Sequence, residues 1–205
     1  MKRLLIISIF ISVVSTIEAY GNKSDIGRRL TFGCEWGYIA TFHHGIHNNF
    51  FSEEGYRVDT NKKRLDYHSN GELYAHIGIN TGKHWNFSLY AGYAGIYSLQ
   101  HAMPVSIRAT RYFNENSRGD RWFAFFDAGS GVGFKEKPQE ILAGKLGGGY
   151  AMALSMKTKI SVVASYRVTY AHTTVIYDGY VVQDSMINRN NAYVSAFSIG
   201  LSLTF

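Results

Sequence analysis

The sequence predicts an all-β protein: an eight-stranded antiparallel transmembrane β-barrel with an N-terminal signal peptide. The first observation is that residues 192–205 alternate between large apolar side chains at odd positions, apart from one serine, and small or polar ones at even positions, as in a strand between two environments. The second is their length, which exceeds the roughly ten residues that a tilted strand needs to cross a bilayer. The third is composition, with 15 Tyr, 13 Phe and 21 Gly against 2 Pro, which favours long strands over helices.

The N-terminus has the layout of a secretory signal peptide. Met1-Lys2-Arg3 is basic, residues 4–14 form an apolar run, and a small residue, Ala19, stands at the expected cleavage point. The apolar run is shorter than a spanning helix requires, which argues against the alternative of a membrane anchor. We therefore expect a signal peptide over 1–19 and one barrel domain over 20–205.

Composition excludes several other classes of protein. The net charge is +6, but the Lys and Arg residues are scattered apart from the run 62–64, so nucleic-acid binding is not expected. The single cysteine, Cys34, cannot form an internal disulfide. Nothing in the chain calls for a cofactor.

Four alternating stretches lie between residues 31 and 113. One face of 31–43 consists of Phe32, Cys34, Trp36, Tyr38, Ala40 and Phe42. The apolar face of 71–81 consists of Leu73, Ala75, Ile77 and Ile79, and that of 85–97 of Phe87, Leu89, Ala91, Tyr93 and Tyr97. In 104–113, Val105, Ile107 and Ala109 alternate with polar residues. Pro104 is tolerable there as the first residue of a strand.

The other four stretches repeat the pattern. In 121–134 the apolar face is Trp122, Ala124, Phe126, Ala128, Val132 and Phe134, opposite Asp127 and glycines. In 141–154, Leu142, Leu146, Tyr150, Met152 and Leu154 face lipid while Lys145 faces inward. In 159–172 the outward set is Ile160, Val162, Ala164, Tyr166, Val168 and Tyr170. The stretch 192–205 completes the eight.

The connections are of two kinds. Those after the second, fourth and sixth stretches are short, whereas 44–70 and 173–191 are long and polar, and the first can carry strand extensions beyond the membrane. Outer-membrane barrels have short periplasmic turns and longer outside loops. An even number of strands then places both termini in the periplasm.

The inward positions carry balanced charge. Three acids, Glu35, Glu72 and Asp127, accompany three bases, Arg108, Lys145 and Arg167, with His76 beside them. An eight-stranded barrel has room inside only for side chains, and buried charges are costly unless paired. We therefore expect a plugged, ion-paired lumen. A narrow pore, or a proton path through these charges, is the alternative.

Several stretches carry a family resemblance. They are Pro104-Val105-Ser106-Ile107-Arg108, residues 122–134 and residues 145–150, together with the exported N-terminus and the terminal Phe205. In this layout the chain resembles small Gram-negative outer-membrane barrels of the OmpA/OmpX type, including uncharacterised ones. The resemblance implies residence in the outer membrane. It also implies insertion by the outer-membrane assembly machinery, which reads a terminal aromatic strand such as 199–205, so Phe205 is expected to be an assembly signal.

Two histidines have hydroxyl residues close by in the sequence and are candidates for catalysis. Lipid A deacylase barrels use a His with a Ser two residues later on the outer wall, followed by Asn, and spacing of two puts both groups on one face of a strand. Here His172 and Thr174 have that spacing, but Thr replaces Ser and the Asn is missing. His68 and Ser69 are adjacent, so they would point to opposite faces. A deacylase-like enzyme is therefore only an alternative.

Three histidines near the start of the first loop are candidates for metal binding. His43, His44 and His47 could ligate a metal at the barrel rim, but no fourth ligand is placed beside them, so no metal site is expected. The sequence thus predicts a non-enzymatic outer-membrane barrel that contacts lipid through its outer wall. Any extracellular ligand would bind the loops 44–70 and 173–191.

Overall fold

The computed structural model describes residues 30–52, 54–97, 100–113, 119–133, 140–155, 158–172 and 175–205. Its long strands are β1 (Leu30–Phe51), β3 (His68–Asn80), β4 (Trp85–Tyr97), β5 (Gln100–Tyr112), β6 (Arg121–Gly133), β7 (Glu140–Ala153), β8 (Lys159–Ala171) and β11 (Ile187–Thr204). Shorter elements are β2 (Arg57–Arg64), β9 (Ile176–Tyr177), β10 (Tyr180–Val181) and a 3₁₀ turn, Asp184–Met186. The expected signal peptide lies outside the described residues.

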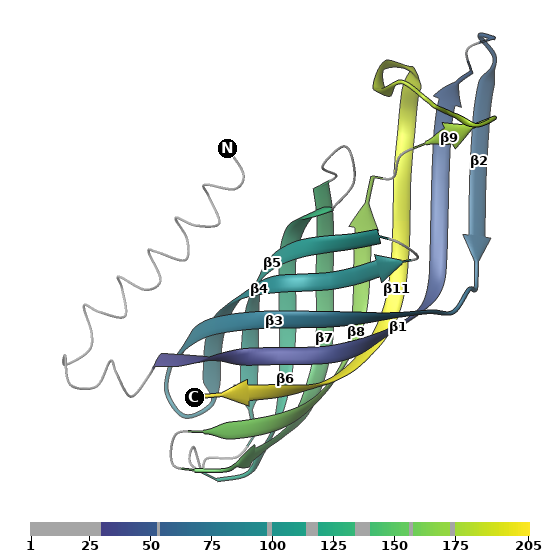
Figure 1. Ribbon diagram of the computed structural model, residues 1–205. Coiled ribbons are helices and arrows are strands. Elements are labelled where there is room, and N and C mark those ends of the chain that lie inside the picture. Colours follow the sequence, from purple (N-terminus) through teal and green to yellow (C-terminus); the bar gives the residue numbers. More distant parts are fainter. Residues whose placement is uncertain are drawn as a thin grey trace, which may run out of the picture.

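The eight long strands form a closed antiparallel barrel (Figure 1), which confirms the predicted fold class. Strands pair in the order β11-β8-β7-β6-β5-β4-β3-β1, and β11 pairs again with β1. Among the described residues, no helix is long and apolar enough to cross a membrane.

The closing seam ends in a clasp between Phe32 and Phe205. The backbone N–H of Phe205 donates to the Phe32 carbonyl at 2.8 Å, and the N–H of Phe32 donates to the Phe205 carbonyl at 3.2 Å. The two rings are stacked with centroids 5.5 Å apart. The last residue therefore joins the wall of the barrel.

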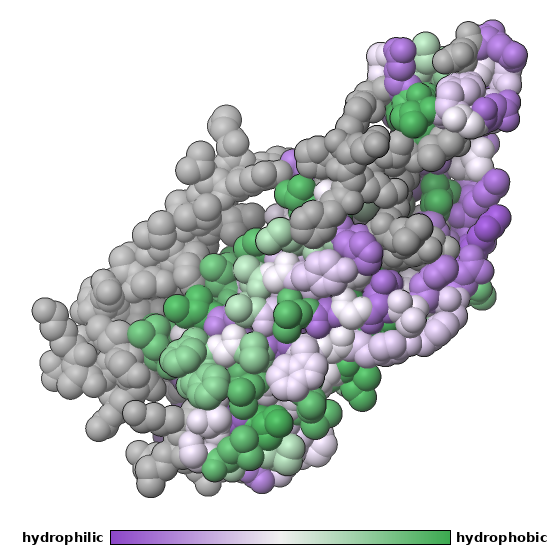
Figure 2. Space-filling model, in the orientation of Figure 1, coloured by the Kyte–Doolittle hydropathy of each residue, from purple (hydrophilic) through white to green (hydrophobic). Residues whose placement is uncertain are grey.

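The wall alternates between lipid-facing and lumen-facing side chains as predicted. On β6, Trp122 and Phe126 are 65% and 57% exposed, whereas Phe125 and Asp127 are each 3% exposed. Figure 2 shows apolar residues gathered over the barrel wall. Large aromatics stand near both ends of this wall, as at membrane interfaces: Phe32, Trp85, Trp122 and Phe205 at one end, Tyr93 and Tyr193 at the other.

A β-bulge at Phe42 shifts the alternation on β1. Thr41 pairs with Ala196 and His43 pairs with Ser195, so Phe42 is an extra residue on β1. Ser195, the single polar residue on the apolar face of β11, is buried and accepts a hydrogen bond from the Tyr166 hydroxyl at 3.2 Å. A neighbouring side chain on the outer wall thus satisfies its polar group.

Pro104 does not begin its strand, contrary to the expectation from the sequence. β5 already starts at Gln100. Its ladder with β4 skips from Val105 to Ala102, while Pro104 remains opposite Gly131 of β6. Proline has no N–H to donate, and the interrupted ladder on the β4 side accommodates that loss.

The long connections build one folded projection on one side of the barrel (Figure 1). β1 continues to Phe51 between β11 on one side and β2 on the other. The β9–β10 hairpin packs here too, because Phe50, Val175 and Val182 form a buried cluster with Val58, Tyr177, Tyr180, Met186 and Ile187 around it. We call residues 44–64 and 175–191 the extension. Part of the loop expected at 44–70 is therefore strand.

Candidate functional site

The lumen contains a row of charged residues set by strand register. Arg108 of β5 is directly opposite Asp127 of β6, which is opposite Lys145 of β7, which is opposite Arg167 of β8. All four side chains are nearly fully buried. Since directly opposed residues share one face of a sheet, these side chains form a band along one wall, here called the ionic layer.

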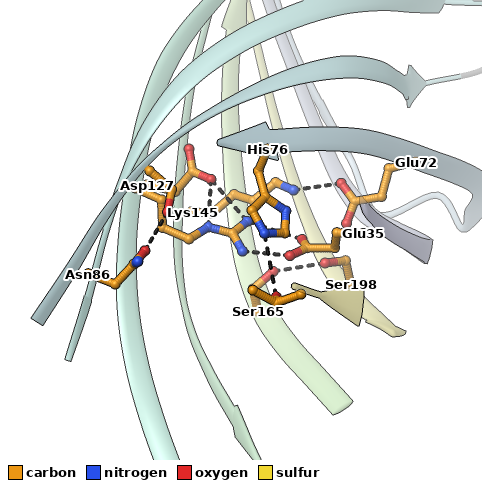
Figure 3. A network of polar contacts seen from close by, with 11 residues as sticks. Glu35, Glu72, His76, Asn86, Asp127, Lys145, Ser165 and Ser198 are labelled. Atoms are coloured by element: carbon orange, nitrogen blue, oxygen red, sulfur yellow. Dashed lines mark hydrogen bonds and ion pairs between the residues drawn. The ribbon is translucent and has the colours of Figure 1, made fainter. Parts of the chain in front are cut away.

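Two glutamates complete the ionic layer from other strands (Figure 3). Arg108 Nη1 donates to Glu35 Oε2 at 2.6 Å and Nη2 donates to Glu35 Oε1 at 3.1 Å. Lys145 Nζ donates to Glu72 Oε2 at 2.7 Å. Because Glu35 lies on β1 and Glu72 on β3, these ion pairs tie distant strands together.

The remaining contacts of the ionic layer involve Asp127 and Arg167. Arg108 Nε and Nη2 each donate to Asp127 Oδ2 at 3.1 Å. Arg167 Nη1 is 3.6 Å from Glu72 Oε2, and its Nε donates to Thr169 at 3.1 Å. Every buried carboxylate of the ionic layer therefore has a cationic partner, as low-dielectric burial requires.

Aromatic rings flank the buried cations. The Arg108 guanidinium lies 3.9 Å from the ring centroid of Tyr90 and 4.1 Å from that of Phe125. Lys145 Nζ lies 4.4 Å from the ring of Tyr74. Cation–π attraction is stronger in a desolvated site, so the rings offset part of the cost of removing these cations from water.

His76 belongs to this region but makes no ion pair in the described structure. Its ring stacks on Tyr90 with centroids 4.8 Å apart, and its Nε2 is 3.4 Å from the Thr204 hydroxyl. Its Nδ1 is buried without a hydrogen-bond partner. The structure thus brings together six of the seven inward residues singled out from the sequence as ion pairs and places His76 beside them.

The lumen is apolar on one side of the ionic layer and largely polar on the other. Toward the extension, an apolar cluster fills the lumen: Ile96, Ala102, Ile141, Ala171 and Val194. Toward the C-terminus, a cavity of about 40 Å³ is lined largely by hydroxyl, amide and aromatic side chains together with Glu35, His76 and Arg108. This volume accommodates on the order of one to three water molecules.

The candidate catalytic residues receive little support from their placement. His172 is exposed just beyond β8, where its Nδ1–H donates to the carbonyl of Asn190. Thr174 lies outside the described residues. His68 and Ser69 are adjacent on β3, and their side chains alternate across the strand.

The histidines of β1 do not assemble a metal centre. Among the described residues, no group of three His, Cys, Asp or Glu side chains could hold an ion. His44 is buried, whereas His43 packs edge-on against Tyr193. His47 Nε2 is 3.0 Å from Asp59 Oδ1, so its near partner is a single carboxylate of β2.

Side-chain contacts hold the extension together. Asn49 donates to Asp59 at 2.8 Å and accepts from Arg57 Nε at 3.0 Å. The hydroxyls of Tyr56 and Tyr177 are 2.9 Å apart and join the first long connection to the last. The sequence predicted both loops but not their association. The apolar residues at 50, 58, 175 and 182, which stand within polar stretches, were the signal for it.

The fold is shared with solved bacterial outer-membrane proteins. The outer membrane protein OprG of Pseudomonas aeruginosa superposes with a TM-score of 0.51 at 13% identity, covering 85% of this chain and 95% of OprG. The chain is an eight-stranded β-barrel of the outer-membrane type. An apolar outer wall and a charged, filled lumen agree with that location, and so the protein is assigned to the outer membrane.

Other similarities are weaker. Neisserial surface protein A matches with a TM-score of 0.44 at 11% identity, covering 85% of this chain and 97% of its own. The outer membrane protease OmpT of Escherichia coli matches at 0.37 and 8% identity, covering 86% and 96%. Neither a protein-family model nor the sequence of a curated protein matches the chain.

Proposed function

We propose that the protein is a non-enzymatic, non-conducting outer-membrane barrel that displays the extension as a preformed binding surface outside the cell. The observation that carries the proposal is the buried cluster around Phe50, Val175 and Val182. A loop that packs its own apolar core loses less conformational entropy when it binds than a disordered loop does. Such a surface is suited to recognition.

The filled lumen supports the non-conducting part of the proposal. The apolar cluster at Ile96 and Val194 lies between the extension and the ionic layer. Below it, the Arg108–Glu35 and Lys145–Glu72 pairs link different strands across the interior. An ion would have to separate these pairs to pass, at a cost of several kcal/mol.

Two experiments test the two parts. Purified protein in a planar bilayer should give no steady current, and stable channels would contradict the closed lumen. For recognition, cells that display the intact protein are compared with cells that display a variant whose residues 52–66 are replaced by a short turn, on arrays of immobilised polysaccharides and proteins. Retention of the intact form alone is expected, and identical profiles would contradict the binding role.

A third measurement tests the absence of enzyme activity. Lipid A from expressing cells should keep all its acyl chains. Loss of a chain that His172→Ala abolishes would replace the proposal with a lipid-modifying enzyme.

A further inference from the structure

We propose that the outer wall at β1, β8 and β11 binds one lipid A anchor of lipopolysaccharide, with an acyl chain in a groove of the wall and a phosphate at Lys63. The site lies on the lipid-facing surface and on the β2 edge of the extension. It shares Lys63 and Gly45 with the extension, but its test uses point variants and measures bound lipid directly, so it can fail independently of the binding role proposed above.

The acyl-chain part of the site is a groove of about 520 Å³. Ala40 and Ala164 are the small residues of its outer lining, and larger side chains rise around them: Tyr38, Leu146, Tyr166, Phe197 and Ile199. The wall is therefore indented here, with two alanines among larger apolar side chains. In a membrane, a hydrocarbon chain is the occupant of matching chemistry.

A polar patch follows on the same strands, toward the extension. Gly45 pairs with Lys63 on β2 and with Tyr193 on β11. A Cβ placed on Gly45 would lie 3.8 Å from His43 Cε1 and 4.0 Å from Lys63 Cγ, so these two side chains flank the same bare glycine. Gly45 thus presents no side chain between the imidazole of His43, which packs edge-on against the Tyr193 ring, and the cation of Lys63.

Lys63 has its charge available. Across the described ranges it makes no ion pair, and Asp59, four residues earlier on β2, is engaged by His47 and Asn49. A phosphate is the complementary group for an ammonium at a membrane surface. Lys62, the preceding residue, pairs with Ile46 and so points to the other face of the extension.

The spacing between groove and patch fits one lipid molecule. Tyr67, four residues after Lys63, is 67% exposed, and tyrosines are enriched at the level of the membrane interface. At about 3.3 Å per residue, Ala40 and Gly45 are separated by roughly 15 Å along β1, about half of a hydrocarbon core. The groove thus lies in the outer leaflet, where the phosphorylated, multiply acylated lipid is lipid A.

The test measures lipid retained by the intact protein after mild detergent extraction from outer membranes, using native mass spectrometry. The variants are Lys63→Gln for the phosphate contact and Ala164→Phe for the groove. Matched controls are Lys62→Gln, one residue away on the opposite face, and Ala128→Phe, an outward alanine on β6. The mobility shift on gels before and after boiling verifies that each variant is folded.

Wild type and both controls should retain lipid A. Lys63→Gln and Ala164→Phe should each lower its occupancy about fivefold or more, the effect expected when a charge-assisted contact or its partner surface is lost. Equal occupancy in Lys63→Gln and Lys62→Gln, or an unaffected Ala164→Phe, would overturn the proposal. So would equal retention of phosphatidylglycerol and lipid A when both are offered in nanodiscs.

Discussion

Arg108 and Glu35, on strands β5 and β1, form a two-pronged ion pair inside the barrel, with N–O distances of 2.6 and 3.1 Å. The same guanidinium also contacts Asp127. One arginine therefore serves two acids, while Glu72 serves two cations, Lys145 and Arg167. Arg108 with its two acids has one negative charge in excess, and Glu72 with its two cations has one positive charge in excess. The ionic layer is therefore neutral only as a whole.

Glu35 should contribute strongly to the stability of the barrel, because it neutralises the buried charge of Arg108. Glu35→Gln leaves Arg108 with less compensating charge in a buried site, so we expect a loss of about 3–5 kcal/mol in the free energy of unfolding. Urea unfolding in detergent micelles measures it. The control is Glu54→Gln, at an exposed carboxylate in the extension, which should change stability by under about 0.5 kcal/mol. Equal midpoints for the two variants would contradict the prediction.

Gly33 should tolerate no side chain. A Cβ there would lie 1.9 Å from the Leu203 carbonyl oxygen and 2.8 Å from His76 Cε1, so Gly33→Ala must displace the closing seam. We expect a loss of about 1–3 kcal/mol, measured by the same unfolding experiment. Gly45→Ala, whose Cβ would meet nothing closer than 3.8 Å, is the comparison, and equal destabilisation of both would exclude a steric cause at Gly33.

Phe50 should determine the folding of the extension without affecting the barrel. It is 3% exposed, whereas its neighbour Phe51 is 49% exposed. Phe50→Ala removes the centre of the buried cluster, at a local cost of about 3–5 kcal/mol, and should speed proteolysis of residues 44–64 and 175–191. Phe51→Ala should not. If boiling-dependent gel mobility is lost as well, the extension does not fold independently of the barrel.

Asp59 should make the extension sensitive to acid. The hydrogen bond from His47, aided by that from Asn49, lowers the pKa of the Asp59 carboxyl below its ordinary value of 3.8. A lowered pKa in the folded state gives stability that is present above pH 3.8 and is lost as pH falls through the folded value. Amide shifts of residues 47–49 and 57–59 should therefore move below about pH 4 in NMR spectra. Asp59→Asn should abolish the transition, and its persistence would assign it to another group.

Phe205 should act in assembly more than in stability. Phe205→Ala removes the ring stacked on Phe32 but leaves the two backbone hydrogen bonds of the clasp. Protein refolded in detergent should therefore keep its gel mobility shift, while its yield in the outer membrane of cells falls severalfold. Parallel losses in both settings would make the clasp structural and remove the case for an assembly signal.

Much of the fold was predictable because lipid and lumen impose opposite demands on alternate residues. Trp122, Phe126 and Leu146 are outward, and Glu35, Asp127 and Arg167 are inward, as period-two alternation indicates. The extra residue at Phe42 was not predictable, since a bulge leaves the local composition unchanged. The place of Pro104 inside β5 was not predictable either. An interruption in the ladder with β4 accommodates its missing N–H, and such an interruption depends on the partner strand.

The site was predictable as a set of residues but not as a set of contacts. Charge balance indicated pairing, yet only register shows that Arg108, Asp127, Lys145 and Arg167 stand side by side. The folded extension was harder to foresee. Its core joins residues more than a hundred positions apart, Phe50 with Val175 and Val182, and short apolar groups inside polar stretches do not specify their partners.

The division of charge between strands also bears on how the barrel closes during insertion. Within the ionic layer, β5 to β8 supply three cations and one acid, an excess of two positive charges, and β1 with β3 supply the two matching glutamates, Glu35 and Glu72. Before β1 meets β11, these two parts of a curling sheet attract each other through a low-dielectric interior. Electrostatic attraction thus favours inward curling, so the last seam forms between edges already drawn together.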